Sequence, residues 1–162
     1  MLCFAYGSNM DIAQMRKRCP SARFLCIAKL PEHRFVFPRE SQRRRCGVAS
    51  VEPSHGANVW GVVYEVAERD VPHLDCTEGY QPGRARNSYV REALRVLRDG
   101  DAEKPIETEV YIAVPQETPL LPSREYGDLI VDAARFWHLP EAYVNSLEQI
   151  LEQILEQIKV SK

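Results

Sequence analysis

The sequence has 162 residues, of which 44% are hydrophobic and 27% are charged, and its formal net charge is -2. This length fits a single domain with its own hydrophobic core, predicted here to cover residues 1–162. The near-neutral charge disfavours nucleic acid and anionic membranes as main partners, so the expected partner is a small molecule.

The cysteines are five in number, widely scattered, and never arranged as C-x-x-C. This pattern predicts neither a disulfide framework nor a zinc knuckle. No apolar run approaches the ~18 residues that a membrane helix needs, and a polar turn follows Met1 too soon for a secretory signal. We therefore expect reduced thiols, a cytoplasmic location and no membrane partner.

The first half of the chain predicts a sheet with one short helix. An apolar strand at 2–5 is followed by the polar turn "YGSN", and Asp11 is placed to cap a helix that ends before Pro20. Further strands are predicted at 23–30, 33–37, 46–52 and 59–66. Their connections are too short for helical crossovers, which favours an antiparallel or mixed sheet.

The second half predicts a hairpin between helices. Asp70 is placed to cap a short helix, "DVPHLDCTE", and Gly79 stands where a helix end favours glycine. Two strands flank the turn-rich "RDGDAEKP", and a proline-rich connector covers 115–122. Helices are predicted at 124–138 and about 140–159, so the expected fold class is α+β with a helical C-terminal tail.

The last helix contains the repeat "LEQILEQILEQI". Its apolar residues fall on one stripe; they are Leu147, Ile150, Leu151, Ile154, Leu155 and Ile158. We expect an amphipathic helix docked on the domain. A stripe this regular is also compatible with a homodimer formed through helix packing.

The turn after the first strand is one candidate site. Gly7 can adopt a positive φ, Ser8 and Asn9 offer a hydroxyl and an amide, and consecutive backbone N–H groups favour a carboxylate or an oxyanion. The same residue types also suit an ordinary strand-to-helix turn.

Glu78 is the second candidate. It is predicted at the C-terminal end of a short helix, where the helix dipole disfavours an ionised carboxylate. An apolar site beside Tyr80 would raise its pKa further, into a range that suits proton transfer near neutrality. Asp75 is an alternative acid, although a hydrogen bond to loop backbone is its expected role.

An ordered set of motifs resembles the gamma-glutamylcyclotransferases. The set is "FAYGSNM", "CPSARF", "IAKL", "VWGVVYEV", "LDCTEG", "PSREY" and "LPEAY", and it covers nearly the whole chain. The resemblance implies a small β-barrel flanked by helices. It implies that Glu78 is the catalytic acid/base and that the substrate is bound by Tyr6, Gly7, Ser8, Asn9, Tyr89 and Tyr126. The match of Tyr89 is the less direct one, because "GYQPGRARNSY" is longer than in the family.

The implied reaction is internal. The α-amine of a γ-glutamyl amino acid or γ-glutamyl amine attacks its own γ-carbonyl, forming 5-oxoproline and releasing the free amine. The resemblance implies no metal and no cofactor. The basic loop with Arg84 and Arg86 then bears on which amine is accepted.

Other readings of the same residues are weaker. Ser8 has no G-x-S-x-G context, and Cys76 stands beside carboxylates that suppress a thiolate. A metal set of His73, Asp75, Cys76 and Glu78 cannot share one face of a short helix. The run at 43–45, with Arg39, is predicted to be a solvated loop. The main alternative function is a non-catalytic γ-glutamyl-binding module that acts as a regulatory or partner-recruiting dimer.

Overall fold

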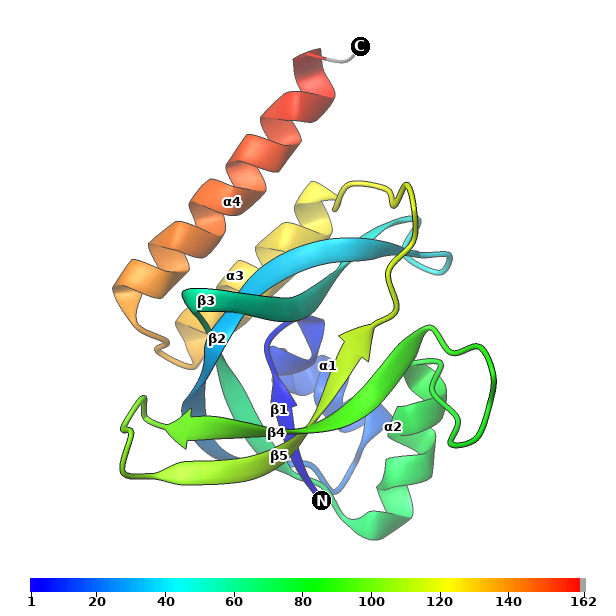
Figure 1. Ribbon diagram of the computed structural model, residues 1–162, viewed down its shortest axis with the longest axis vertical. Coiled ribbons are helices and arrows are strands. Elements are labelled where there is room, and N and C mark those ends of the chain that lie inside the picture. Colours follow the sequence, from blue (N-terminus) through cyan, green and yellow to red (C-terminus); the bar gives the residue numbers. More distant parts are fainter. Residues whose placement is uncertain (161–162) are drawn as a thin grey trace.

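The chain folds into a closed barrel of five strands with helices on its outside (Figure 1). The computed structural model describes the backbone of residues 1–160 and the side chains of residues 1–157. The strands are β1 (Leu2–Ala5), β2 (Arg23–Ser41), β3 (Cys46–Glu65), β4 (Tyr89–Arg98) and β5 (Pro105–Ala113). The helices are α1 (Ile12–Arg18), α2 (Val71–Thr77), α3 (Arg124–Phe136) and α4 (Glu141–Val160), with short 3-10 turns η1 (Ser8–Met10) and η2 (Glu68–Asp70).

The barrel has the strand order β1-β3-β2-β4-β5 and closes through a parallel contact between β1 and β5. All other neighbours in it are antiparallel. The predicted α+β class with a small mixed barrel is therefore confirmed. The interior is packed with apolar side chains, of which Phe4, Leu30 and Val62 are among the most deeply buried.

The strands predicted at 23–30, 33–37, 46–52 and 59–66 are joined pairwise into two long strands, so their predicted ends were wrong. β2 and β3 pair with each other from end to end, and bulges interrupt the register, one of them between Pro31 and His33. Glu32 at this bulge has a φ of 56° and Gly56 opposite has a φ of 75°. A bulge accommodates a proline without ending the strand and bends both strands around the barrel.

The helix starts were predicted with mixed success. Asp11 caps α1, because its carboxylate accepts a hydrogen bond from the Gln14 amide at 2.6 Å. Asp70 stands at the start of α2 but makes no capping bond; its carboxylate instead accepts from the Ser21 amide at 2.9 Å. Gly79 ends α2 with a φ of 67°, as predicted.

The hairpin of β4 and β5 and the connector after it lie where the sequence places them. Asp99 and Gly100 both have positive φ, which is the backbone twist that a tight hairpin turn needs. The connector runs from the end of β5 to Ser123, whose hydroxyl accepts from the Tyr126 amide at 3.2 Å and caps α3.

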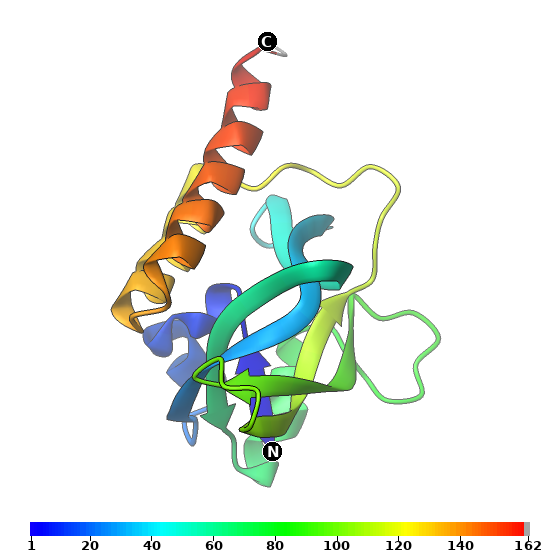
Figure 2. The ribbon, with the colours of Figure 1, turned by 60° about the vertical axis from the view of Figure 1, so that its left-hand side comes forward.

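α4 lies alongside α3 on one side of the barrel, and its C-terminal end projects beyond the barrel (Figures 1 and 2). Leu147 and Leu151 are buried in the core, whereas Ile150 is 36% exposed. Only part of the predicted apolar stripe is therefore docked, and the side chain of Ile158 lies outside the described residues. No helix in the part of the chain that the structure describes is long and apolar enough to cross a membrane.

Candidate active site

A small cavity of about 40 Å³ lies at the C-terminal end of β1. It is lined by every residue that the sequence nominates for the site: Tyr6, Gly7, Ser8, Asn9, Glu78, Tyr89 and Tyr126. These residues come from the turn after β1 that includes η1, the end of α2, the start of β4 and α3, so the barrel and its helices bring four separate segments together.

The cavity meets a wide groove of about 1000 Å³. Four residues line both spaces: Ser8, Glu78, Tyr89 and Tyr126. Glu78 therefore lies at the junction of the cavity and the groove.

Glu78 directly follows α2, and its side chain is 12% exposed. Its Oε1 accepts hydrogen bonds from the Asn9 amide nitrogen at 2.9 Å and from an Arg18 guanidinium nitrogen at 3.1 Å. Arg18 also donates to the Asn9 side-chain oxygen at 2.5 Å. No partner for Oε2 is found within residues 1–157. One carboxylate oxygen is therefore held in place, and the other can accept a hydrogen bond or a proton from a ligand.

The surroundings of Glu78 act on its pKa in opposite directions. Burial raises the pKa of Glu78, because the apolar interior disfavours the charged carboxylate. The Arg18 guanidinium, the hydrogen bond from Asn9 and the charge of Arg44 oppose this rise without cancelling it. The carboxyl group is thus shifted toward the range in which it can take up and return a proton near neutral pH.

The turn after β1 begins with Gly7 and continues as η1. The φ of Gly7 is -113°, so Gly7 does not use the positive φ that glycine allows. A Cβ atom at this position would lie 3.1 Å from the Ala49 Cβ, so any larger residue would crowd β3 there. The amides of Ser8 and Asn9 head the 3-10 turn and have no partner within it, which leaves two N–H donors at the cavity.

Ala49 on β3 holds the two tyrosines that come from β4 and α3. Its carbonyl accepts from the Tyr89 hydroxyl at 2.9 Å, and its amide donates to the Tyr126 hydroxyl at 3.1 Å. The Tyr126 hydroxyl also interacts with the Ser8 side chain. These bonds fix both rings as walls of the cavity.

Asp75 and Tyr80 differ from their predicted roles. Within residues 1–157 the Asp75 side chain makes no hydrogen bond to loop backbone; it accepts from Arg91 at 2.9 Å and from the Tyr111 hydroxyl at 2.6 Å. Tyr80 does not line the cavity, and its ring instead lies 5.5 Å from the Arg91 guanidinium carbon. Asp75 is therefore tied into a buried network behind the site and is not an alternative acid within it.

Arg18 and Arg44 contribute to the site although the sequence did not indicate them. Arg44 belongs to the basic run predicted to be a solvated loop, yet its guanidinium carbon lies 4.8 Å from the centre of the Tyr126 ring. Its Nη2 also donates to Gln14 Oε1 at 2.5 Å. Arg18 stands in the last turn of the helix that follows the "YGSN" turn, which was the only available signal for it.

The described side chains form neither the serine–histidine pair of a hydrolase nor a metal site. No hydrogen bond joins Ser8 to a histidine within the described side chains. Across the same residues, no three of His, Cys, Asp and Glu gather closely enough to hold a metal ion.

Comparisons with known proteins agree with the resemblance seen in the sequence. Residues 58–147 match the model of the AIG2-like family. The chain is 33% identical over 154 residues to the mouse protein named gamma-glutamylcyclotransferase, covering 92% of this chain and 78% of the relative. It is 32% identical over 153 residues to the human protein of the same name, with the same coverage.

Solved structures give the same picture. A structure titled gamma-glutamyl cyclotransferase superposes with a TM-score of 0.80 at 31% identity, covering 91% of this chain and 86% of that one. A Bacillus subtilis protein with a TM-score of 0.76 covers 94% of this chain and 54% of its own, and at 19% identity it shows a shared fold.

Proposed function

This chain belongs to the gamma-glutamylcyclotransferase family, and we propose that it converts a small γ-glutamyl compound to 5-oxoproline and a free amine. In this reaction the α-amino nitrogen forms a bond to the γ-carbonyl carbon of the same molecule. The bond from that carbon to the leaving nitrogen then breaks. No water molecule is consumed.

The observation that carries the proposal is the unequal use of the two oxygens of Glu78. Asn9 and Arg18 hold Oε1, whereas Oε2 has no hydrogen-bond partner among the described side chains. The substrate ammonium group, with a reference pKa of about 8, must lose a proton before it can attack, and the leaving nitrogen must gain one. Oε2 accepts the first proton and delivers it to the leaving nitrogen, so one carboxylate serves both steps.

The other site residues select the reactive conformation. The glutamyl group lies in the cavity between Tyr89 and Tyr126, and the amides of Ser8 and Asn9 donate to the γ-oxygen as it becomes negatively charged. Because nucleophile and carbonyl belong to one molecule, correct placement accounts for on the order of 7 to 11 kcal/mol of the barrier. Ser8 is a positioning residue in this scheme.

The proposal is tested by product analysis. Purified protein is incubated with γ-glutamyl amino acids and γ-glutamyl amines. The products 5-oxoproline and glutamate are then separated and quantified. Cyclisation yields 5-oxoproline, whereas a serine hydrolase would yield glutamate. A Ser8→Ala variant that still forms 5-oxoproline supports the positioning role, and absence of 5-oxoproline across the whole panel contradicts the proposal.

The non-catalytic binding module predicts a different result. Such a protein would bind the γ-glutamyl compounds without turning them over. Its site would also not need a carboxylate whose pKa is raised by burial, which favours the enzyme. A homodimer through α4 and a cytoplasmic location stay predictions, and the first is checked by light scattering of the purified protein.

A further inference from the structure

The groove must receive the leaving part of the substrate if the proposed function is correct. Cyclisation places the γ-amide bond at Glu78, and the glutamyl side of this bond lies in the cavity. Glu78 marks the junction of the cavity with the groove, so the amine on the other side of the bond extends into the groove.

The groove is strongly basic. Its lining includes five cationic side chains, Lys17, Arg18, Arg39, Arg43 and Arg44, against three acidic ones, Asp11, Glu40 and Glu78. Two of these three are already engaged, because Asp11 caps α1 and Glu78 accepts from Arg18.

Four of the cations have no carboxylate partner among the described side chains. Arg39 and Arg44 are held by neutral groups, namely the Val114 carbonyl at 2.9 Å and Gln14 Oε1 at 2.5 Å. Lys17 and Arg43 are exposed at the rim of the groove. Elsewhere exposed arginines do find acidic partners, as Arg95 does with Glu107 at 2.7 Å. The groove thus retains more positive than negative charge, and two of its cations, Arg39 and Arg44, are held in place without a carboxylate partner among the described side chains.

Gln14 adds an unused hydrogen-bond donor to the same groove. Its Oε1 is occupied by Arg44, while its buried Nε2 has no acceptor within residues 1–157. A buried donor without an acceptor is unusual in a folded protein. A carboxylate bound at Arg44 would neutralise its guanidinium next to Gln14.

We propose that the groove selects γ-glutamyl substrates whose leaving amine carries two carboxylates, as glutamate and aspartate do. This inference rests on the proposed function and adds the class of its leaving group. A neutral leaving amine leaves the cations unpaired, and a basic one, such as lysine or a polyamine, is repelled by them. The order of kcat/KM is therefore acidic over neutral over basic leaving amines.

The test uses three γ-glutamyl dipeptides that share a backbone and differ at one side chain. γ-Glutamyl-glutamate and γ-glutamyl-glutamine are nearly identical in shape and differ by one negative charge, while γ-glutamyl-lysine, linked through the α-amine, carries a positive charge. The kcat/KM for 5-oxoproline formation is expected to favour γ-glutamyl-glutamate over γ-glutamyl-glutamine by about fivefold. Added salt is expected to reduce this ratio, because it screens charges at the rim.

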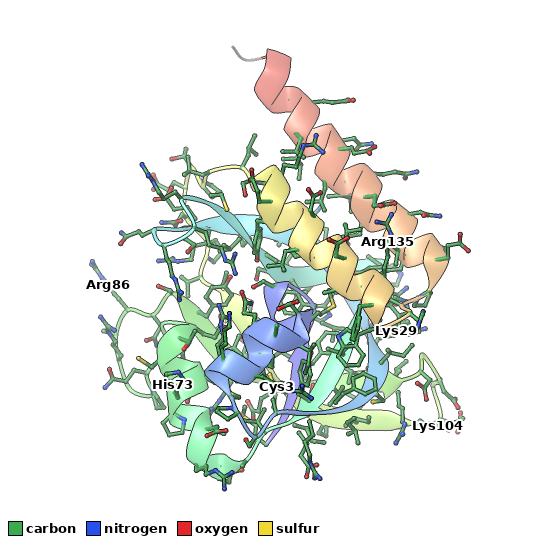
Figure 3. The ribbon with its side chains drawn as sticks, turned by 180° about the vertical axis from the view of Figure 1, so that it is seen from behind. Cys3, Lys29, His73, Arg86, Lys104 and Arg135 are labelled. Atoms are coloured by element: carbon green, nitrogen blue, oxygen red, sulfur yellow. The ribbon has the colours of Figure 1, made fainter. Side chains whose placement is uncertain are left out.

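Two double variants, each of which removes two positive charges, test which residues select the leaving amine. Lys17→Gln with Arg43→Gln removes two groove cations that do not touch Glu78 and leaves Arg44 in place, so it is expected to lower the ratio without bringing it to one. An unchanged ratio in this variant overturns the inference. Arg84→Gln with Arg86→Gln is the matched control on the loop 80–88, whose Arg86 extends outward from the molecule (Figure 3). The control is expected to keep the wild-type ratio.

Each outcome decides between the inference and the function on which it rests. Equal kcat/KM for the glutamate and glutamine dipeptides overturns the inference and leaves the proposed function in place. Loss of the ratio in the Arg84 and Arg86 control also overturns the inference, because the loop would then be the selecting element. If no dipeptide yields 5-oxoproline, the proposed function fails and the inference fails with it.

Discussion

Glu78 is an ionisable group in surroundings that disfavour its charge. Its side chain is 12% exposed, and burial raises its pKa more than Arg18 and Asn9 lower it. The position at a helix end and the raised pKa were predictable from the sequence. The contact with Arg18 was not, because the two residues are sixty positions apart and meet only when α1 and α2 pack against each other.

Replacing Glu78 with glutamine is expected to stabilise the fold at neutral pH. The raised native pKa means that the contribution of Glu78 to stability is fully present below the usual glutamate pKa of about 4.3 and is lost as pH rises through the native pKa. Glutamine has the same shape and no charge to bury. Thermal unfolding should therefore give a higher Tm for Glu78→Gln at pH 8 and similar values at pH 4, and a lower Tm at pH 8 would contradict this account.

Replacing Arg18 with glutamine is expected to move the acid limb of the kcat/KM profile to higher pH. The positive charge of Arg18 lowers the pKa of Glu78, so its removal lets that pKa rise further. Arg18→Lys keeps the charge and should shift the limb less. Arg16→Gln is the control, since Arg16 is exposed on the same helix and does not line the groove. An acid limb that stays in place in Arg18→Gln would show that Glu78 is not the base.

The position of each element follows from local sequence, but its ends depend on partners elsewhere. The Asp11 cap and the glycine after α2 were readable because each acts within one turn of its own residue. The Asp70 cap was not, because its carboxylate binds the distant Ser21 amide instead. β2 was predicted as two strands because Pro31 resembles a strand end. Pairing with β3 along its whole length decides otherwise, and such pairing between distant residues is not encoded in a local pattern.

α2 is fastened to the β4–β5 hairpin by the buried contacts of Asp75. Asp75→Asn removes the charge that pairs with Arg91, and it weakens the bond to Tyr111. The expected loss is about 2 to 3 kcal/mol of unfolding free energy in urea titration. Arg95→Gln breaks an exposed pair with Glu107 on the same hairpin, so it should cost less than about 1 kcal/mol. Equal losses in the two variants would argue against a special role for the buried network.

α4 is expected to contribute stability through its first half. Leu147 is 1% exposed, so Leu147→Ala should lower the unfolding free energy by about 2 to 4 kcal/mol. Ile150→Ala, one turn further on the exposed side, should change it by about 0.5 kcal/mol. Equal effects would mean that the whole apolar stripe is covered in solution, which is the result that the predicted homodimer requires.

The candidate active site lies where the barrel closes. β1 pairs with β3 on one side and touches β5 on the other, so the turn that follows β1 opens directly at the end of the barrel. The sequence identified the residues around this opening through their motifs. It could not indicate that the cavity continues into a basic groove, because Lys17 on α1 lies far along the chain from Arg39 on β2 and Arg43 in the turn after it, and none of them matches a motif.

The most direct test of the account compares 5-oxoproline formation by the wild-type protein and Glu78→Gln, with binding of the γ-glutamyl substrate measured by calorimetry. Glutamine can keep the hydrogen bonds of Oε1 but cannot transfer a proton. We predict that kcat falls by a factor of at least about 100 while the dissociation constant stays within a few-fold of wild type. A Glu78→Gln variant that retains the wild-type kcat would contradict the central claim.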